Sequence, residues 1–308
     1  MDWFNLFFVA FLASTIRIAC PILFAALGEN ISEKAGVLNV GLEGMIMAGA
    51  FTGYAMMFFT GNLLISLLGG ILAGALCGLA HAFISITLKQ NQMVSGLAIN
   101  IIMIGLTSYL NRVLFGVYLV PKAITPMQSW KIPVLGDIPV IGTILFNHIP
   151  LVYISILLVP IIHVLLNYTS IGLKIRSVGE HPLAADTLGI NLKRVRYYCV
   201  LFCGMMAGLG GTFLSLGNMN IFLDEMSAGR GYIALAAVIF GKWKPFGVLG
   251  AVLFFSGAEA LSTRLQAVGS NIPVEYLGML PYLATVIALA FTAKKGSGPA
   301  ALGQPYWR

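Results

Sequence analysis

Charged residues are scarce in this sequence, and that scarcity excludes a soluble globular protein. Only 9% of the 308 residues are charged, whereas 58% are hydrophobic. A soluble domain carries about 25% charged residues. Apolar runs recur along the whole chain, each near the roughly 20 residues that a helix needs to cross a bilayer. The runs are unbroken, unlike the alternating strands of a membrane β-barrel. The sequence therefore predicts an all-α polytopic membrane protein.

Catalytic and metal-binding patterns are also lacking. The chain contains no G-x-S-x-G, no H-E-x-x-H and no cluster of cysteine and histidine ligands. The phosphate-binding pattern G-x-x-x-x-G-K-[ST] is absent, because Trp243 follows Lys242 and Ala236 occupies the first glycine position. We therefore expect no enzyme activity, no metal and no cofactor in this chain. If ATP powers its function, another subunit must bind the ATP and its Mg.

The apolar runs predict about nine membrane-spanning helices, within a range of about 8–10. They form a single transmembrane domain over residues 1–308. Arg17 lies inside the first run, so either it reaches the interface from a tilted span or residues 3–16 form an interfacial helix. The predicted spans are 3–27, 36–59, 63–88, 94–118, 149–167, 195–216, 229–241, 247–265 and 276–293.

The basic residues predict the orientation of the chain. The net charge is +7, and the basic side chains lie in short loops and at chain ends, where the positive-inside rule places them. We interpret this charge as topology and expect no nucleic-acid partner. The densest cluster, with Lys174, Arg176, Lys193, Arg194 and Arg196, makes the loop 168–194 cytoplasmic. Counting spans from this loop places the N-terminus outside and the C-terminus in the cytoplasm.

Two blocks of the sequence share a layout. The first span is followed by the polar stretch GENISEK (28–34) and a glycine-rich run, and the sixth by GNMNIFLDEM (217–226) and a second glycine-rich run. Because the first span runs inward and the sixth outward, the blocks predict inverted repeats with interrupted helices. In transporters such helices lie near a solute site in the middle of the membrane.

Some of the glycines have a simpler role. Gly70, Gly74 and Gly78 stand four residues apart in the third span, and Gly204 and Gly208 repeat this spacing in the sixth. Such faces are typical of helices whose backbones pack closely.

Ionisable and amide side chains inside the spans are the candidates for a solute pathway, because burying them in a membrane is costly. Asn39 lies one turn before Glu43 on the same helical face. Asn100 suits a hydrogen bond to a hydroxylated solute, although asparagines also join helices. For His81 and His163 we favour packing over proton relay. The pathway candidates are Asn39, Glu43, Asn100 and Glu259.

The predicted cytoplasmic loop contains a short capped helix. Pro182 suits a first helical position and Gly189 suits the residue just beyond a helix end. Leu183 and Leu188 can share one face, which indicates a knob that docks on a soluble partner. The alternative is an ordinary surface helix held near lipid headgroups. The predicted coupling residues are Glu180, His181, Pro182, Leu183, Asp186, Leu188 and Gly189.

Four segments in order carry a resemblance to a known family. They are AGVLNVGLEGMIMAGAFTG (35–53), NQMVSGLAIN (91–100), GLKIRSVGEHPLAADTLGIN (172–191) and GYIALAAVIFGKWKPFG (231–247). They resemble bacterial ABC-transporter permeases for nucleosides, within the branched-chain amino acid and ribose permease superfamily. The resemblance covers nearly the whole chain.

This resemblance implies nucleoside uptake across a bacterial inner membrane. It implies a heterodimer with a second related permease, an ATPase subunit that binds ATP and Mg, and a substrate-binding lipoprotein outside. It also implies that the 180–189 segment meets the ATPase, and that Asn39, Glu43 and Asn100 lie in motifs near the pathway. The alternatives are a simple-sugar ABC permease of the ribose or galactose type and an ion-coupled secondary transporter using Glu43, Glu259 or His81.

Overall fold

The computed structural model describes residues 3–116, 122–133, 136, 138, 140–267, 273–281, 283, 286 and 298–306. In this part of the chain, 7 helices are long and apolar enough to cross a membrane, and α10 is a shorter apolar helix. The prediction of an all-α polytopic membrane protein is confirmed. The helices are α1 (Trp3–Lys34), α2 (Leu42–Thr60), α3 (Leu63–Ala82), α4 (Gln92–Phe115), α5 (Ile141–Leu145), α6 (Pro150–Tyr168), α7 (Ser170–Glu180), α8 (Pro182–Thr187), α9 (Leu192–Phe213), α10 (Arg230–Phe240), α11 (Pro245–Ala267) and α12 (Val274–Gly278).

Short elements extend or connect these helices. Two π-helical turns, η1 (Phe83–Thr87) and η3 (Leu214–Met219), prolong α3 and α9. Strands β1 (Trp130–Lys131) and β2 (Asn147–His148) pair antiparallel in the connection between α4 and α6. The predicted loop 168–194 contains the helices α7 and α8. The predicted ninth span, 276–293, lies mostly outside the described residues.

The first helix is longer than the predicted span 3–27. It continues through GENISEK to Lys34, and it is unbroken at Arg17. The chain leaves the helix only in residues 35–41, the first break, before α2 begins at Leu42. The interruption therefore follows the polar stretch, whereas the predicted spans 3–27 and 36–59 leave that stretch between them. The physical reason is that Glu29, Asn30, Ser32 and Glu33 are all 0% exposed, because they pack inside the helix bundle and not in a loop.

Glycine faces bring α3 and α9 together. A Cβ placed on Gly208 would lie 3.0 Å from the Cα of Gly74, and one on Gly204 would lie 3.1 Å from the Cα of Gly78. These approaches leave no room for a larger side chain. The predicted close backbone packing at each glycine face is confirmed, and the structure shows that each face is the partner of the other.

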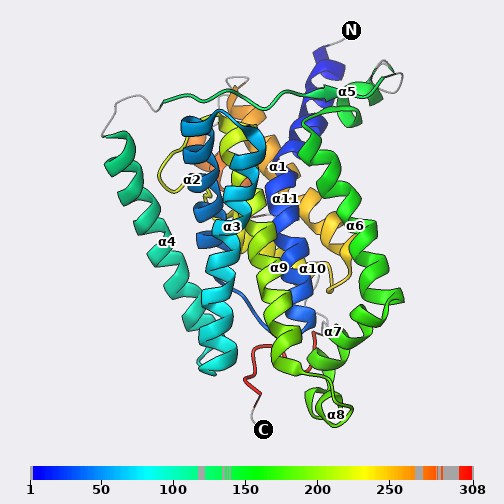
Figure 1. Cartoon of the computed structure of the whole chain (residues 1–308). Coiled ribbons are helices and arrows are strands. Elements are labelled where there is room, and N and C mark those ends of the chain that lie inside the picture. The colour runs from blue at the N-terminus through cyan, green and yellow to red at the C-terminus, as the bar shows by residue number, and fades with distance from the viewer. Residues whose placement is uncertain are drawn as a thin grey trace.

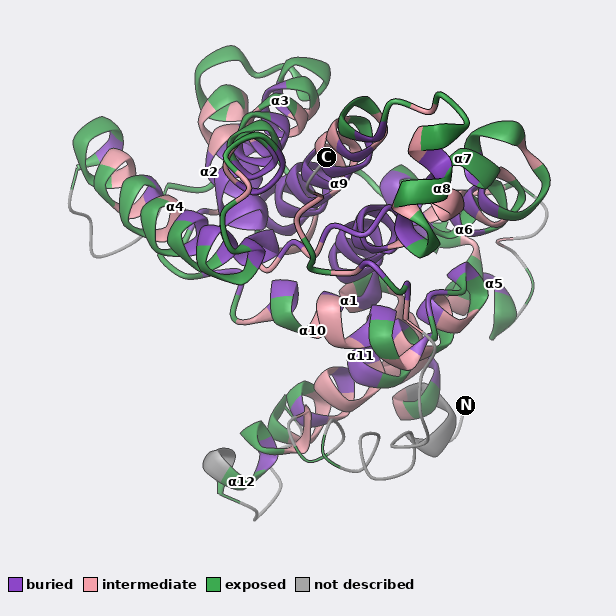
Figure 2. Cartoon of the chain, turned by 90° about the horizontal axis from the view of Figure 1, so that it is seen from below, coloured by how far each residue is buried: buried purple, intermediate pink, exposed green. Residues whose placement is uncertain are grey.

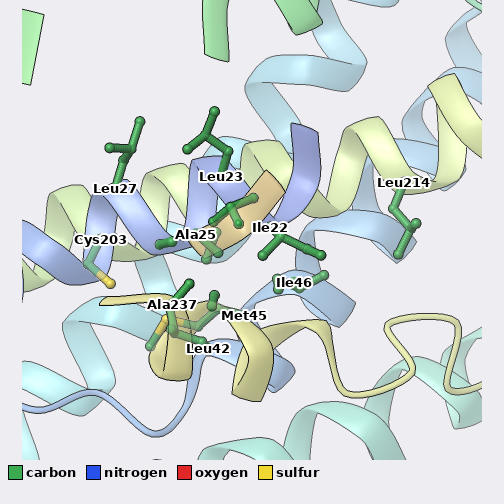
Figure 3. Close-up of a cluster of buried hydrophobic side chains, with 14 of the residues drawn as sticks. Ile22, Leu23, Ala25, Leu27, Leu42, Met45, Ile46, Cys203, Leu214 and Ala237 are labelled. Atoms are coloured by element: carbon green, nitrogen blue, oxygen red, sulfur yellow. The ribbon is translucent and has the colours of Figure 1, made fainter. Parts of the chain in front are cut away.

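The core is built around α1, α2 and α9. α9 packs against α1, α2 and α3, and Figure 2 shows long buried stretches of α1, α2 and α9 in purple. Figure 3 shows Leu42 and Met45 of α2 beside Ala237 of α10, with Ile22 and Ala25 of α1 close to them. The two helices that follow chain breaks, α2 and α10, therefore share one core with α1.

The two ends of the bundle differ. Figure 1 places α8 and the C-terminal segment at the bottom, and the N-terminus with the connection between α4 and α6 at the top. A second break, residues 220–229, separates η3 from α10. α4 stands at the edge of the bundle, where Figure 2 shows much of its surface exposed.

Candidate functional site

Glu43 joins the two interrupted helices. It lies in the first turn of α2, and its carboxylate accepts hydrogen bonds from the backbone N–H of Gly229 and of Gly231, both at 2.7 Å. Those N–H groups belong to the start of α10, where backbone donors lack partners within the helix. A Cβ on Gly231 would lie 2.7 Å from the Cα of Glu43, so only glycine permits this approach. A side chain of one short helix thus caps the other.

Asn100 holds the start of α2 against α4. Its Oδ1 accepts the N–H of Gly44 at 2.8 Å, and its Nδ2 donates to the carbonyl of Val40 at 2.9 Å. The same Nδ2 donates to the Tyr232 hydroxyl of α10 at 3.1 Å. Asn100 is buried, whereas Tyr232 is 45% exposed. One amide therefore connects α4 with both interrupted helices.

Asn39 lies in the first break and is 0% exposed. Its Oδ1 accepts the N–H of Gly41 at 3.0 Å, and its own N–H donates to Glu29 at 2.9 Å. Its Nδ2 contacts the sulfurs of Met45 at 3.3 Å and Cys203 at 3.5 Å. All of these partners lie within the chain, so the side chain fixes the backbone of the break.

Glu259 lies apart from the other three candidates, on α11. It forms an ion pair with Arg230, the first residue of α10, and the glutamate side chain is 23% exposed. The guanidinium also donates to the carbonyls of Met226 at 3.1 Å and Ser227 at 3.3 Å. Arg230 therefore ties α11 to the second break.

Two buried acids of α1, Glu29 and Glu33, were not among the predicted site residues. Glu29 accepts the thiol of Cys203 at 3.2 Å, and Glu33 accepts the indole N–H of Trp243. Trp243 lies in the turn between α10 and α11. Glu29 and Glu33 are four residues apart, which places both on one helical face. This spacing was the sequence signal that could have revealed them. These acids connect α1 to the first break, α9 and the turn after α10.

The two histidines inside the spans have structural surroundings. His81 is 0% exposed and lies 3.2 Å from the hydroxyl of Ser95 and 3.1 Å from the carbonyl of Leu38. The ring of His163 packs beside that of Phe246, with centroids 5.0 Å apart.

The predicted short helix is present as α8. Pro182 occupies its first turn, and Gly189 follows its end with φ of 79°. Leu183 is 69% exposed and Leu188 80% exposed, whereas Ala185 is buried. Two exposed apolar side chains therefore stand at α8, one within the helix and one directly after its end, and α8 lies at the bottom of the bundle (Figure 1).

The surroundings of α8 are polar and fixed by the C-terminal segment. The Tyr306 hydroxyl donates to Asp186 at 2.9 Å, and the N–H of Ala300 donates to Glu180 at 3.3 Å. His181 is exposed. A cavity of about 490 Å³ beside the helix is lined by Lys89, Asp186, residues 189–193 and Tyr306. The exposed helix α8 and the adjacent cavity thus lie at the same end of the bundle.

Comparison with known proteins identifies the family. Residues 11–289 match the family described as "Branched-chain amino acid transport system / permease component". The chain belongs to this family.

Individual permeases show the same relationship over their whole length. The permease is 41% identical to the guanosine ABC transporter permease protein NupQ of Bacillus subtilis, over 95% of each chain. It is 36% identical to the nucleoside ABC transporter permease protein NupC of Lactococcus lactis, over 96% of this chain and 95% of NupC. It is also 33% identical to the putative glucose ABC transporter permease protein TsgC13 of Haloferax volcanii, over 98% of each chain.

Proposed function

We propose that this chain is the membrane permease subunit of an ABC importer for nucleosides in a bacterial plasma membrane. It pairs with a second, related permease, most simply as a heterodimer. A separate ATPase subunit binds ATP and Mg, and an extracytoplasmic lipoprotein delivers the solute. The observation that carries the proposal is the 41% identity to a guanosine permease over 95% of both chains.

The proposed orientation places α8 and the C-terminus in the cytoplasm and the N-terminus outside. The N-terminus and α8 lie at opposite ends of the bundle (Figure 1), which supports this assignment. Lys174, Lys193 and Arg194 lie at the α8 end and are all exposed, as the positive-inside rule requires.

The proposed contact with the ATPase is α8. Exposed leucines are expensive to keep in water, so Leu183 in α8 and Leu188 directly after its end favour a partner surface. Closure of the ATPase on ATP would move α8 and, through it, the membrane helices. Glu180, His181 and Asp186 would supply the polar rim of this contact, and Pro182 and Gly189 its fixed ends.

Replacing Leu188 by Glu tests the coupling role. We expect Leu188→Glu to insert normally and to lose ATP-driven uptake, because the charge enters an apolar contact. Thr187→Glu adds the same charge to the neighbouring exposed position and should retain most uptake. Normal uptake by Leu188→Glu would remove the coupling assignment.

The proposed pathway runs beside the interrupted helices. The starts of α2 and α10 are held in place by Glu43, Asn100 and Asn39. Glu259 contributes through its ion pair with Arg230. They would shape the pathway by fixing its walls, and the solute would contact the surfaces that they position.

The substrate is tested with the complete transporter in proteoliposomes. Labelled guanosine, other nucleosides and glucose are offered with the binding protein inside or outside the ATP-loaded vesicle. We expect nucleoside uptake that requires both ATP and the external binding protein. Uptake of glucose alone would favour a sugar permease, the second candidate, which the 33% identity to TsgC13 supports.

The same vesicles test an ion-coupled mechanism. Accumulation on a pH gradient, by this chain alone and without ATP, would show a secondary transporter and overturn the proposal. The contacts of two of the three candidate proton carriers argue against that outcome, since both carboxylate oxygens of Glu43 and both ring nitrogens of His81 have partners inside the chain.

A further inference from the structure

A small cavity opens at the end of the bundle opposite α8. It has a volume of about 160 Å³ and lies between the last turns of α2 and α4 and the second break. Pockets that enclose a whole drug-sized ligand measure about 300–1,000 Å³. The space therefore suits one ring of a solute, with the rest of the molecule outside. We call it the outer cavity.

Aromatic rings form the floor of the outer cavity. The ring of Tyr54 lies 5.1 Å from that of Phe115 and 6.1 Å from that of Phe222, measured between centroids. The Tyr54 hydroxyl donates to the carbonyl of Lys122 at 2.8 Å. All three rings are buried, so the floor of the cavity is aromatic and apolar.

Polar groups form its walls. Asp224 lies in the second break, and its carboxylate lies 3.5 Å from the guanidinium of Arg112, with the aspartate side chain 38% exposed. Asn111, the neighbour of Arg112 on α4, also lines the cavity. A partly exposed carboxylate beside an amide suits neighbouring hydroxyl groups, because the carboxylate accepts strong hydrogen bonds and the amide both donates and accepts.

We propose that the outer cavity binds the ribose hydroxyls of a nucleoside as it enters the permease, with Asp224 and Asn111 as the recognising groups. This assignment rests on the proposed function and adds a specificity site to it. The size of the cavity fits a sugar ring better than a sugar with its base. A nucleoside without hydroxyls would make no hydrogen bond to this carboxylate beside its ion pair with Arg112, and a site built to bind a hydroxyl group discriminates against a solute that lacks it.

The test compares a ribonucleoside with its 2′,3′-dideoxy counterpart in the assembled, ATP-driven transporter. The binding protein is the same in every sample, so a change in preference comes from the permease. We expect Asp224→Asn to transport the ribonucleoside but to lose about tenfold of the preference for it, since hydrogen bonds to charged groups contribute about 1.5–3 kcal/mol. Asn111→Ala should lose less.

Arg112→Gln is the matched control, because it removes the ion pair and keeps the carboxylate. We expect this variant to retain the wild-type preference. A loss equal to that of Asp224→Asn would show that only the ion pair matters and would overturn the inference. So would an unchanged preference in Asp224→Asn. Failure of the wild type to carry any nucleoside would instead overturn the proposed function and this assignment with it.

A labelling experiment covers the case in which Asp224→Asn does not fold. The four native cysteines are buried, so a cysteine introduced at Leu223, which lines the cavity and is 39% exposed, can be labelled selectively with an impermeant maleimide. Ribonucleoside should slow labelling of Leu223→Cys more than the dideoxy analogue does. Trp130→Cys, at a 59% exposed position outside the cavity, should be unaffected. Equal protection by the two nucleosides, with uptake intact, would overturn the inference.

Discussion

The two chain breaks interrupt their helices in contrasting ways. In the first break, residues 35–41, every residue is buried or half-buried. In the second break, residues 220–229, Leu223, Asp224, Glu225 and Ala228 are exposed. In the first break, the residue with positive φ is a glycine, Gly36. In the second break, three residues other than glycine have positive φ: Asn220, Glu225 and Ala228. The first break is buried by its contacts, whereas the second is partly exposed and has a strained backbone.

The difference indicates which break moves. Side chains from two helices, α1 and α4, hold the first break: Glu29 binds the N–H of Asn39, Gln92 the N–H of Leu38, and Asn100 the carbonyl of Val40. The second break is held at its end by Glu43 and by the Arg230 contacts with Met226 and Ser227. We therefore expect the first break to act as a fixed support and the second to rearrange during transport.

The largest effect is expected from removing the link between the breaks. Glu43→Ala leaves the N–H groups of Gly229 and Gly231 without their acceptor, and each unpaired buried donor costs about 1–3 kcal/mol. We expect a loss of about 4 kcal/mol in stability, seen as a much lower Tm of the purified protein and as lost uptake. Glu225→Ala is the control, because Glu225 is an exposed acid of the second break. Equal losses in the two variants would contradict the capping role.

The sequence predicted the elements better than their connections. Apolar runs indicated the spans, four-residue glycine spacing indicated close helix packing without naming the partner, and Pro182 with Gly189 marked both ends of α8. These signals are local. The partner of Glu43 is 186 residues away along the chain, so no local pattern reveals it.

The end of the first span was missed for a similar reason. Hydropathy falls at Glu29 and Glu33, which suggests a loop, whereas the bundle supplies partners that let a polar helix continue. Cys203 and Trp243 donate to these acids from other elements. Tertiary contacts, which composition cannot show, decided where the helix ends.

A second test compares two asparagines of α4. Asn100→Ala removes three hydrogen bonds to the first break and the two interrupted helices, and interhelical hydrogen bonds in membrane proteins contribute about 0.6 kcal/mol each on average. We expect a loss of about 2 kcal/mol, measured as the shift in the denaturation midpoint in mixed micelles. Asn111→Ala, at the outer cavity, should change stability little. A larger loss of stability in Asn111→Ala than in Asn100→Ala would contradict the view that the first break is the more firmly held of the two.

A third test concerns the glycine of the first break. Gly36 has φ of 85°, and a Cβ there would lie 3.0 Å from Arg196 and 3.2 Å from the carbonyl of Ala301. Gly36→Ala should therefore cost about 2 kcal/mol, from backbone strain and crowding together. Gly61→Ala isolates the strain, because Gly61 has φ of 63° and nothing within 4 Å. Thermal unfolding of both variants should show the smaller loss for Gly61→Ala; equal losses would mean that the first break is not tightly packed.

The smallest effect, and one of opposite sign, is expected in the second break. Ala228 has φ of 47°, a conformation that glycine adopts without strain, so Ala228→Gly should raise stability by less than about 1 kcal/mol once the greater freedom of the unfolded glycine is included. Ala236→Gly, in the interior of α10, should lower stability by about 1 kcal/mol. If the strain at Ala228 is kept for movement, the stabilised variant should also transport more slowly at saturating solute. Faster transport, or a loss of stability in Ala228→Gly, would show that the second break is not strained for function.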